Sequence, residues 1–311
     1  MRNFTFISAK QLFFQDNKFI NRNLAIQLIA GFSLINICIL LPDLFKIFGE
    51  TGLIQFEVTK QFIFSYQPVI HWFTKPFGNS LLARNIILII FTFMYIFSLL
   101  NMIRNYKRLF YSILAWLLHF ILMNSSFLMT YGADGMISFA LFITVFLSVP
   151  IIFPKTKSIM GSFVIRFLQV HLCLVYFFGG LGKFLGTDWL DGNALWYVSH
   201  MFSPEYSEFF SFFAKYPFVF KVMGWIVLFS ELFYPLLIYT PVLKKWCLSI
   251  IILMHFFIAV TMHLYTFGAV MILLNLIAFG QYFQKEYWVI KDCINYAEKW
   301  LKIKIFNRYI A

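Results

Sequence analysis

The sequence predicts an all-α fold, a polytopic transmembrane helical bundle of about eight spans. Three observations carry this prediction. Of the 311 residues, 61% are hydrophobic and only 12% are charged, whereas a soluble domain has about half apolar and about a quarter charged residues. The mean hydropathy is +0.79. Several apolar runs approach or exceed the ~20 residues that cross the hydrocarbon core of a bilayer as a helix.

The apolar runs define the spans in order along the chain. Each run is close to the length that a membrane-crossing helix needs, and polar or basic residues separate most runs from the next. The last two runs are separated only by a tight turn, so we expect them to form a hairpin. The predicted spans are residues 24–41, 82–102, 109–129, 136–153, 162–182, 218–239, 246–265 and 267–283.

Lysine and arginine residues set the predicted orientation. They concentrate in the N-terminal tail (1–23), in the connections after the second, fourth and sixth spans, and in the basic C-terminal tail (284–311). Cytoplasmic segments carry an excess of these residues, so we expect both tails in the cytoplasm, flanking a transmembrane domain over 24–283. The C-terminal tail has helical spacing and is expected to be amphipathic. The long loops 42–80 and 183–217 then lie outside, where their aromatic residues favour interfacial helices and function.

The net charge of +12 has the same explanation. Basic residues beside membrane spans meet anionic lipid, and no nucleic-acid motif or basic groove with interleaved aromatic residues is present. The expected partner is therefore membrane lipid and not nucleic acid. The histidines lack HExxH spacing, so no metal site is predicted. The high phenylalanine and lysine usage is typical of an AT-rich bacterial genome, and we expect a location in the bacterial cytoplasmic (inner) membrane.

Lys183 is the central candidate for function, because ionisable residues within spans are costly and are usually retained for a role. It ends the fifth predicted span among glycines, and the carboxylates of Asp188 and Asp191 follow. One interpretation is a lysine that snorkels to the membrane surface. The other is a catalytic base, since the glycines permit close backbone approach and a partly desolvated lysine can act as a base near neutral pH.

Three further polar residues are expected in one pocket that opens to the outer side with Lys183. His255 lies near mid-membrane, His263 at the outer end of the same span, and Asn124 within two turns of that surface. His255 could instead be an interhelical hydrogen-bonding residue. Glu231, in the sixth span, could bond backbone groups freed by the proline that follows it, or pair with Arg166.

Three blocks of sequence share one known pattern. Residues 166–198, RFLQVHLCLVYFFGGLGKFLGTDWLDGNALWYV, combine a Gln-x-His helix, an aromatic run, a glycine pair, a lysine, and then Trp and Gly. Residues 230–272 hold an acidic-Pro helix followed by a His-bearing helix, and 123–150 hold a span exit followed by a Gly-x-Asp turn. In order and spacing these blocks resemble the HTTM domain, the membrane domain shared with vitamin K-dependent gamma-carboxylase. The resemblance extends over roughly residues 20–283.

The resemblance implies a chemistry and a set of roles. In the carboxylase, a lysine of this loop deprotonates reduced vitamin K, and Lys183 is the matching residue. The later histidines correspond to the His-bearing helix, where proton relay is expected. The cofactor implied is reduced vitamin K or menaquinol, held by an aromatic wall. The residues expected to be catalytic are Lys183, His255, His263 and Asn124, and those expected around the cofactor are Phe177, Phe178, Trp189 and His171.

Departures from the carboxylase leave the reaction open. The carboxylase has a lysine pair where this chain has Gly182-Lys183, and its third-span histidine is replaced around Asn124. The resemblance does not extend to the lumenal domain that binds substrate peptides. We therefore expect either a carboxylase-like, lyase-type enzyme that uses a quinol and a peptide or protein substrate, or a non-catalytic membrane protein. The second would assist maturation or export of a secreted peptide, or bind lipid. Lys183→Ala is expected to abolish activity with folding intact in the first case, and to be silent in the second.

Overall fold

The computed structural model describes residues 22–49, 52–64, 66–78, 80–151, 157–202 and 216–283, and within these ranges the regular structure is helical, with no strand. Six of the helical segments are long and apolar enough to cross a membrane. The chain is therefore an all-helical, multi-pass membrane protein, as predicted. The basic tail (284–311) and residues 1–21 lie outside the described residues.

The six membrane-length segments agree closely with six of the predicted spans. They are Arg22–Phe48 (α2, Arg22–Leu40, with η1, Leu41–Asp43, and α3, Leu44–Phe48), α6 (Leu81–Ile103), α7 (Arg108–Ser125), Met160–Phe184 within α9 (Lys157–Phe184), α15 (Lys244–Thr261) and Tyr265–Phe283 (α16, Tyr265–Phe279, with η7, Gly280–Phe283).

Two further apolar helices run beside these six but are shorter. The first, α8 (Gly132–Ser148), has 17 residues and continues into η4 (Val149–Ile151). The second, α13 (Pro217–Leu232), has 16 residues and is followed by α14 (Tyr234–Leu237). The remaining described helices are short and lie in the connections. They are α4 (Phe56–Thr59), α5 (Ile70–Thr74), η2 (Lys75–Phe77), η3 (Phe127–Met129), α10 (Thr187–Leu190) and α11 (Ala194–Phe202).

The long helices are apolar on both their buried and their exposed sides. In α2, for example, Ile26 and Ile29 are buried, whereas Ile35 and Ile39 are 62% and 66% exposed. A surface helix of a soluble protein carries polar residues on its exposed side. The exposed isoleucines are instead suited to contact lipid tails, which require no hydrogen bonding from the protein surface.

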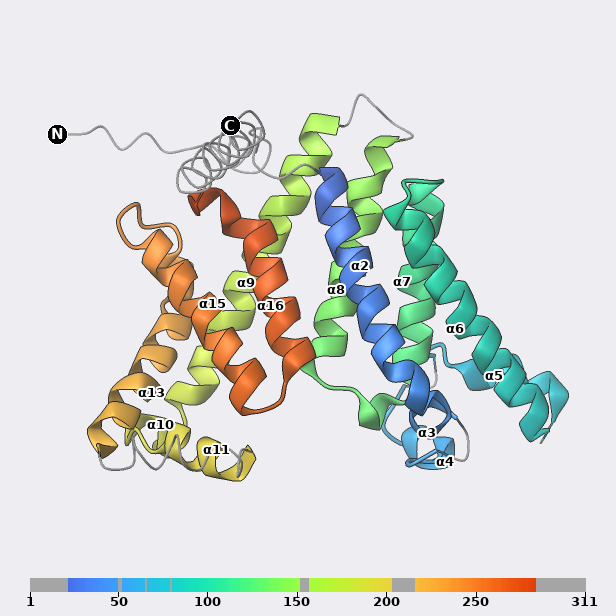
Figure 1. Ribbon diagram of the computed structural model, residues 1–311, viewed down its shortest axis with the longest axis horizontal. Coiled ribbons are helices and arrows are strands. Elements are labelled where there is room, and N and C mark those ends of the chain that lie inside the picture. Colours follow the sequence, from blue (N-terminus) through green and yellow to red (C-terminus); the bar gives the residue numbers. More distant parts are fainter. Residues whose placement is uncertain are drawn as a thin grey trace, which may run out of the picture.

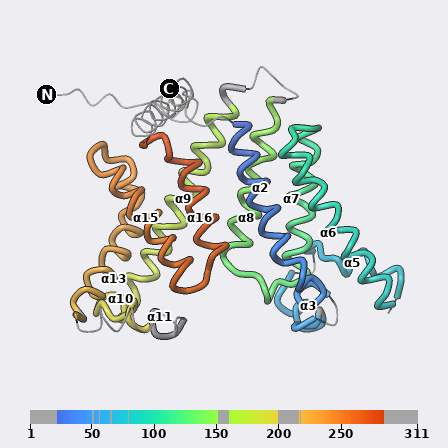
Figure 2. The backbone as a smooth tube through the Cα atoms, viewed as in Figure 1, coloured from blue at the N-terminus to red at the C-terminus, as the bar shows by residue number. Residues whose placement is uncertain are grey.

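The helices pack in two neighbouring groups around one continuous apolar core (Figures 1 and 2). One group holds α2, α6, α7 and α8, and the other holds α9, α13, α15 and α16. The groups meet where α8 and α9 pack together and where α16 contacts both of them. The core cluster draws buried residues from both groups, such as Leu141 of α8, Leu172 of α9 and Leu274 of α16.

The two ends of the bundle differ in the connections that they carry. We name each end after one residue. At the Arg108 end, at the top of Figure 1, short turns join α6 to α7 and α14 to α15. At the Lys183 end, at the bottom, lie α3, α4, α5, α10 and α11. The described parts of the two long loops predicted from the sequence, 42–80 and 183–217, thus lie at the Lys183 end and contain short helices, as expected.

The predicted hairpin of the last two spans is confirmed. The first helix, α15, ends at Thr261, and α16 begins at Tyr265. Between them His263 has a φ of 54°, the left-handed conformation that commonly ends a helix. The two helices pack closely at Gly268. A Cβ added there would lie 2.5 Å from the carbonyl oxygen of His255.

Candidate functional site

Close packing between α9 and the end of α13 forms the framework of the site. A Cβ added at Gly180 would lie 2.4 Å from the backbone nitrogen and 2.6 Å from the Cα of Leu232. Only glycine fits this contact, since carbon atoms in ordinary contact are about 3.5–4.0 Å apart. The close backbone approach predicted from the glycines before Lys183 is therefore confirmed. It brings the end of α9 against Glu231.

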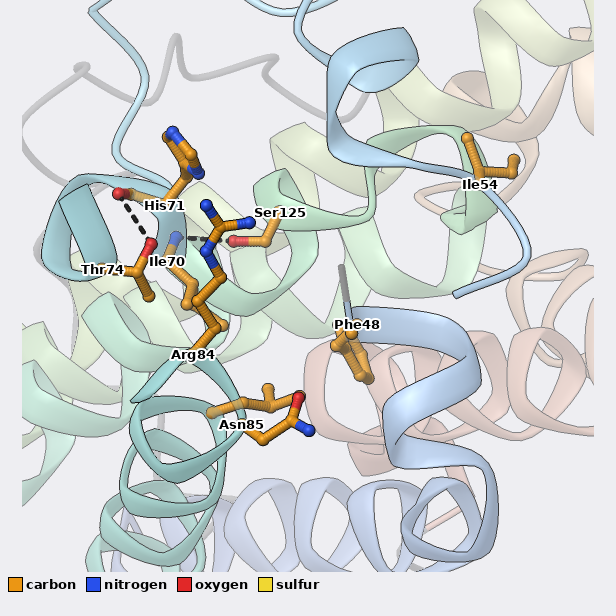
Figure 3. A pocket seen from close by; sticks show the side chains of 10 residues that line it. Phe48, Ile54, Ile70, His71, Thr74, Arg84, Asn85 and Ser125 are labelled. Carbon is orange, nitrogen blue, oxygen red and sulfur yellow. Dashed lines mark hydrogen bonds between the residues drawn. The ribbon is translucent and has the colours of Figure 1, made fainter. Parts of the chain in front are cut away.

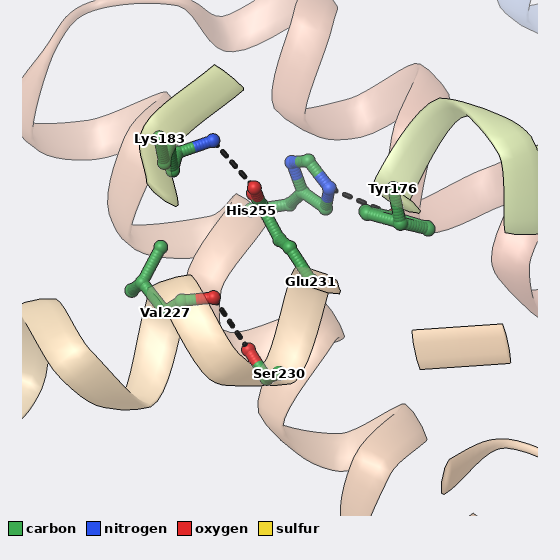
Figure 4. Close-up of polar contacts among 6 residues, drawn as sticks. All are labelled: Tyr176, Lys183, Val227, Ser230, Glu231 and His255. Carbon is green, nitrogen blue, oxygen red and sulfur yellow. Dashed lines mark hydrogen bonds and ion pairs between the residues drawn. The ribbon is translucent and has the colours of Figure 1, made fainter. Parts of the chain in front are cut away.

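Lys183 forms an ion pair with Glu231 across this contact. The Lys183 Nζ lies 2.5 Å from the Glu231 Oε2, and the two side chains are 25% and 7% exposed (Figure 4). The ammonium group also lies 5.3 Å from the ring centroid of Trp189, the distance of a cation–π contact. The pairing of Glu231 with Arg166 considered from the sequence is wrong, because Arg166 Nη1 donates to Gln169 Oε1 at 2.8 Å instead.

A buried hydrogen-bonded network lies next to the ion pair and joins α9, α14, α15 and α16. The Tyr234 hydroxyl donates to Asn275 Oδ1 at 2.8 Å, and Asn275 Nδ2 donates to the Tyr176 hydroxyl at 2.6 Å. The Tyr176 hydroxyl and His255 Nε2 are 2.8 Å apart. Each of these residues is 3% exposed or less. Interhelical hydrogen bonds of this kind hold membrane helices together.

The network assigns the protons of His255. The Tyr176 oxygen accepts from Asn275, so we assign the Tyr176 hydroxyl as the donor to His255 Nε2, and the imidazole proton then lies on Nδ1. His255 Nδ1 is buried and has no hydrogen-bond partner. Figure 4 shows this nitrogen on the side of the Lys183–Glu231 pair. An unsatisfied N–H donor therefore faces the ion pair.

Other residues predicted for the site lie elsewhere. Asn124 Nδ2 donates to the carbonyl of Pro68 at 3.3 Å, so it fastens the first long loop to the end of α7. His263 is exposed in the α15–α16 turn, where its Nδ1 lies 2.8 Å from the hydroxyl of Tyr265. His171 stacks on Phe139 of α8, with ring centroids 3.6 Å apart.

The predicted aromatic wall is only partly assembled. Trp189 covers the Lys183 ammonium group. Phe178 follows the inward-facing Tyr176 by two residues, about 200° around the helix, and is 62% exposed. Phe177, about 100° around from Tyr176, contacts Phe178 edge to face. The two phenylalanines thus lie on the outer side of α9, away from the ion pair.

A small pocket lies near Asn124 at the same end of the bundle, between the first long loop and the adjoining ends of α6 and α7 (Figure 3). It holds about 40 Å³, far less than the roughly 300–1,000 Å³ of a small-molecule site. Ile70 N donates to Ser125 Oγ at 2.8 Å in its wall. The pocket is lined by Phe48, Gly49, Ile54, Ile70, His71, Thr74, Arg84, Asn85, Leu88 and Ser125.

Sequence reasoning missed the partners of the two central residues. Glu231 was noted as a costly charge within a span, but its pairing with Lys183 was not foreseen. Tyr176 and Asn275 carried one signal, a hydrogen-bonding side chain within an apolar helix. Neither could be assigned to His255 without the rotation of each helix. Among the described residues, no group of three or more His, Cys, Asp or Glu gathers as metal ligands would.

Comparisons of this chain with protein-family models, with curated proteins and with solved structures gave no match.

Proposed function

We propose that this chain is an HTTM-type membrane enzyme, related to the transmembrane domain of vitamin K-dependent gamma-carboxylase. In this proposal Lys183 and Glu231 take a proton from a hydroxyl group of reduced vitamin K or menaquinol. The observation that carries the proposal is the Lys183–Glu231 pair beside the unpartnered Nδ1–H of His255. A bound hydroxyl or carbonyl oxygen would satisfy that donor, which otherwise costs about 1–3 kcal/mol as a buried unpaired group.

The proposal requires a specific order of proton transfers within the Lys183–Glu231 pair. An ammonium group has no free electron pair and so cannot accept a proton. Lys183 can act as a base only after one proton has moved to Glu231, and the amine then accepts the hydroxyl proton. Transfer straight to the carboxylate gives the same result, a protonated Glu231 and a charged Lys183. The pair therefore works as one acid–base unit, and the ammonium group remains to stabilise negative charge.

The neighbouring residues have separate roles in this proposal. His255 Nδ1–H orients the ligand oxygen toward the pair, and the network of Tyr176 and Asn275 holds the imidazole in place. Trp189 shields the ammonium group from water. A bound quinol would supply the hydroxyl proton and the electrons for a reaction with oxygen. A peptide or protein substrate on the extracytoplasmic side would then lose a proton from carbon to the product of that reaction and take up carbon dioxide at the same carbon as a new carboxylate.

We further propose that α8 and α13 complete eight spans, with both termini in the cytoplasm of a bacterial inner membrane. The described chain supports this, since α2 begins and α16 ends at the Arg108 end (Figure 1). This end also carries Arg104, Lys107 and the lysines that begin α15, the pattern of a cytoplasmic face. Single cysteines placed at Lys245 and at Asp188 test it. Only the second should react with an impermeant thiol reagent in intact cells, and the reverse labelling would overturn the orientation.

The decisive experiment uses the charge pair as a unit. Lys183→Ala alone leaves Glu231 buried without its counter-charge, and breaking a buried pair costs about 3–5 kcal/mol, somewhat less here because Lys183 is 25% exposed. The earlier expectation that this variant folds normally therefore needs a control. The double variant Lys183→Met/Glu231→Gln removes both charges and should keep the fold.

We expect wild-type membranes to oxidise added menaquinol and the double variant to lose this activity. Mass spectrometry of co-extracted lipids should find a quinone with the wild type. Lys183→Arg should also be inactive, since arginine does not release its proton near neutral pH. Wild-type turnover in a folded double variant would refute the proposal.

One observation favours a second function without catalysis. The Lys183–Glu231 pair also clamps α9 to α13, a structural role that needs no proton transfer. The chain would then bind lipid or assist maturation or export of a secreted peptide. In that case the double variant keeps its cellular function, and substitutions of loop aromatics such as Trp189 and Trp196 have the larger effect.

A further inference from the structure

Charges are segregated between the two ends of the bundle. Among the described residues, every acidic residue lies toward the Lys183 end. These residues are Asp43, Glu57, Asp134, Asp188, Asp191 and Glu231. The Arg108 end carries Arg22, Arg104, Arg108, Lys244 and Lys245, and the described chain supplies no carboxylate there.

Arg108 is buried at this end, and no described residue supplies it with a counter-charge. It begins α7 and is 1% exposed. Its Nε donates to the carbonyl of Met102 at 3.2 Å, and its Nη1 donates to Asn23 Oδ1 at 2.8 Å, both neutral acceptors. Its Nη2 is buried and has no hydrogen-bond partner among the described residues. Burying an uncompensated charge costs several kcal/mol. An anion bound beside the guanidinium group would lower this cost.

A second guanidinium group at this end also has a buried nitrogen without a hydrogen-bond partner among the described residues. This group belongs to Arg22, in the first described turn of α2, and the nitrogen is Nη1. Arg108 Nη1 donates to Asn23, the residue next to Arg22, so the start of α7 lies against the start of α2 and brings the two guanidinium groups to the same end of the bundle. Two like charges side by side repel each other unless an anion lies between or beside them.

The start of α7 adds a third attraction for an anion. Lys107, in the left-handed conformation before the helix, makes no side-chain capping bond to it. The first N–H groups of an α-helix have no partner within the helix, so the 18-residue α7 directs these donors and the positive end of its dipole toward this end. A phosphate group suits this combination, because it has several acceptor oxygens and arginine binds them in pairs.

We infer that Arg22 and Arg108 bind a phosphate group at the Arg108 end of the bundle, carried by an anionic phospholipid. Lipid phosphates are concentrated at the membrane surface, where this end of a membrane bundle lies. The site is separate from Lys183 and does not depend on the proposed catalytic function. A bound lipid would supply the missing negative charge and fasten α2 to α7.

Native mass spectrometry of the full-length purified chain tests this inference. Phosphatidylglycerol is the probe, with phosphatidylcholine, which has a phosphate but no net charge, for comparison. We expect the wild type to bind phosphatidylglycerol preferentially. Arg108→Gln and Arg22→Gln should each weaken this binding roughly ten- to a hundredfold, the effect of losing a charged hydrogen bond. Lys244→Gln is the matched control at the same end, since Lys244 lies over the Tyr282 ring, and it should bind as the wild type does.

Competition by inorganic phosphate distinguishes a lipid phosphate from a free phosphate ion as the bound anion. Competition by millimolar phosphate would support a phosphate site open to solvent, and lack of competition would support one that takes the lipid. If Arg108→Gln does not fold, Arg22→Gln gives the result, because Arg22 is less buried. The inference is overturned if the wild type shows no preference for phosphatidylglycerol, or if the arginine variants bind it as tightly as the Lys244→Gln control.

Discussion

Gly180→Ala is expected to force α9 and α13 apart. The new Cβ would lie 2.4 Å from the nitrogen and 2.6 Å from the Cα of Leu232, and 2.9 Å from the carbonyl carbon of Glu231. All three are backbone atoms, so no side chain can rotate out of the way. Contacts of this kind need about 3.5–4.0 Å, which requires the helices to separate by about 1 Å. Overpacking of this size costs about 1–3 kcal/mol, and occasionally more.

Gly182→Ala is the matched control. It lies in the same helix, and an added Cβ would have no atom within 4 Å. Replacing glycine by alanine in a helix gains about 1 kcal/mol of intrinsic propensity, and this gain is common to both variants. The difference between them therefore measures the clash alone. We expect Gly180→Ala to have a free energy of unfolding about 1–3 kcal/mol below that of Gly182→Ala.

Equilibrium unfolding in mixed micelles of a mild detergent and dodecyl sulfate measures this difference. Circular dichroism reports the helix content. A second measurement is the rate at which an amine reagent modifies Lys183, which should rise in Gly180→Ala because the Lys183–Glu231 pair opens. The reasoning is refuted if the two glycine variants unfold at the same free energy. Equal stability would mean that the α9–α13 contact is looser than the structure shows.

Two other predictions concern packing around the site. Asn275→Leu should lower the free energy of unfolding by about 1–3 kcal/mol, because the buried Tyr234 hydroxyl loses its acceptor and Tyr176 loses a donor; a variant as stable as the wild type in the same micelles would contradict the network. Gly192→Ala should be destabilising twice over, because its φ is +75° and an added Cβ would lie 2.7 Å from the Lys221 Cβ. The control Gly78→Ala also has a positive φ but meets no atom within 4 Å, so it should lose only the conformational cost of about 1–3 kcal/mol. Equal losses in the two variants would rule out the clash.

The helices could be predicted from the sequence because their cause is local. A run of about twenty apolar residues must satisfy its own backbone hydrogen bonds in lipid, and a helix does so within the run. Thus α6, α7 and the α15–α16 hairpin lie close to where the residue pattern placed them. Which residues lie on the outer face of α9 could also be predicted from the sequence. Helical spacing alone places Phe178 far around the helix from Tyr176, which argues against the aromatic wall that the family resemblance implied.

The site could be predicted only in part, because its contacts join distant segments. Lys183 and His255 were identified as costly polar groups in apolar helices, a property of each residue in its own span. The pairing of Lys183 with Glu231 spans 48 positions, and that of His255 with Tyr176 spans 79. These pairings depend on how far each helix is rotated and on a contact that only Gly180 permits.

The sequence by itself determined that this chain crosses a membrane as helices and that Lys183 and His255 are costly polar groups in apolar helices. The tertiary structure alone decided that Glu231 neutralises Lys183, that His255 keeps a free N–H beside that pair, and that Asn124 serves a loop instead. The physical reason is the range of the forces involved. Hydrophobicity and backbone hydrogen bonding act within one helix, whereas charge pairing acts between helices whose relative rotation no single segment specifies.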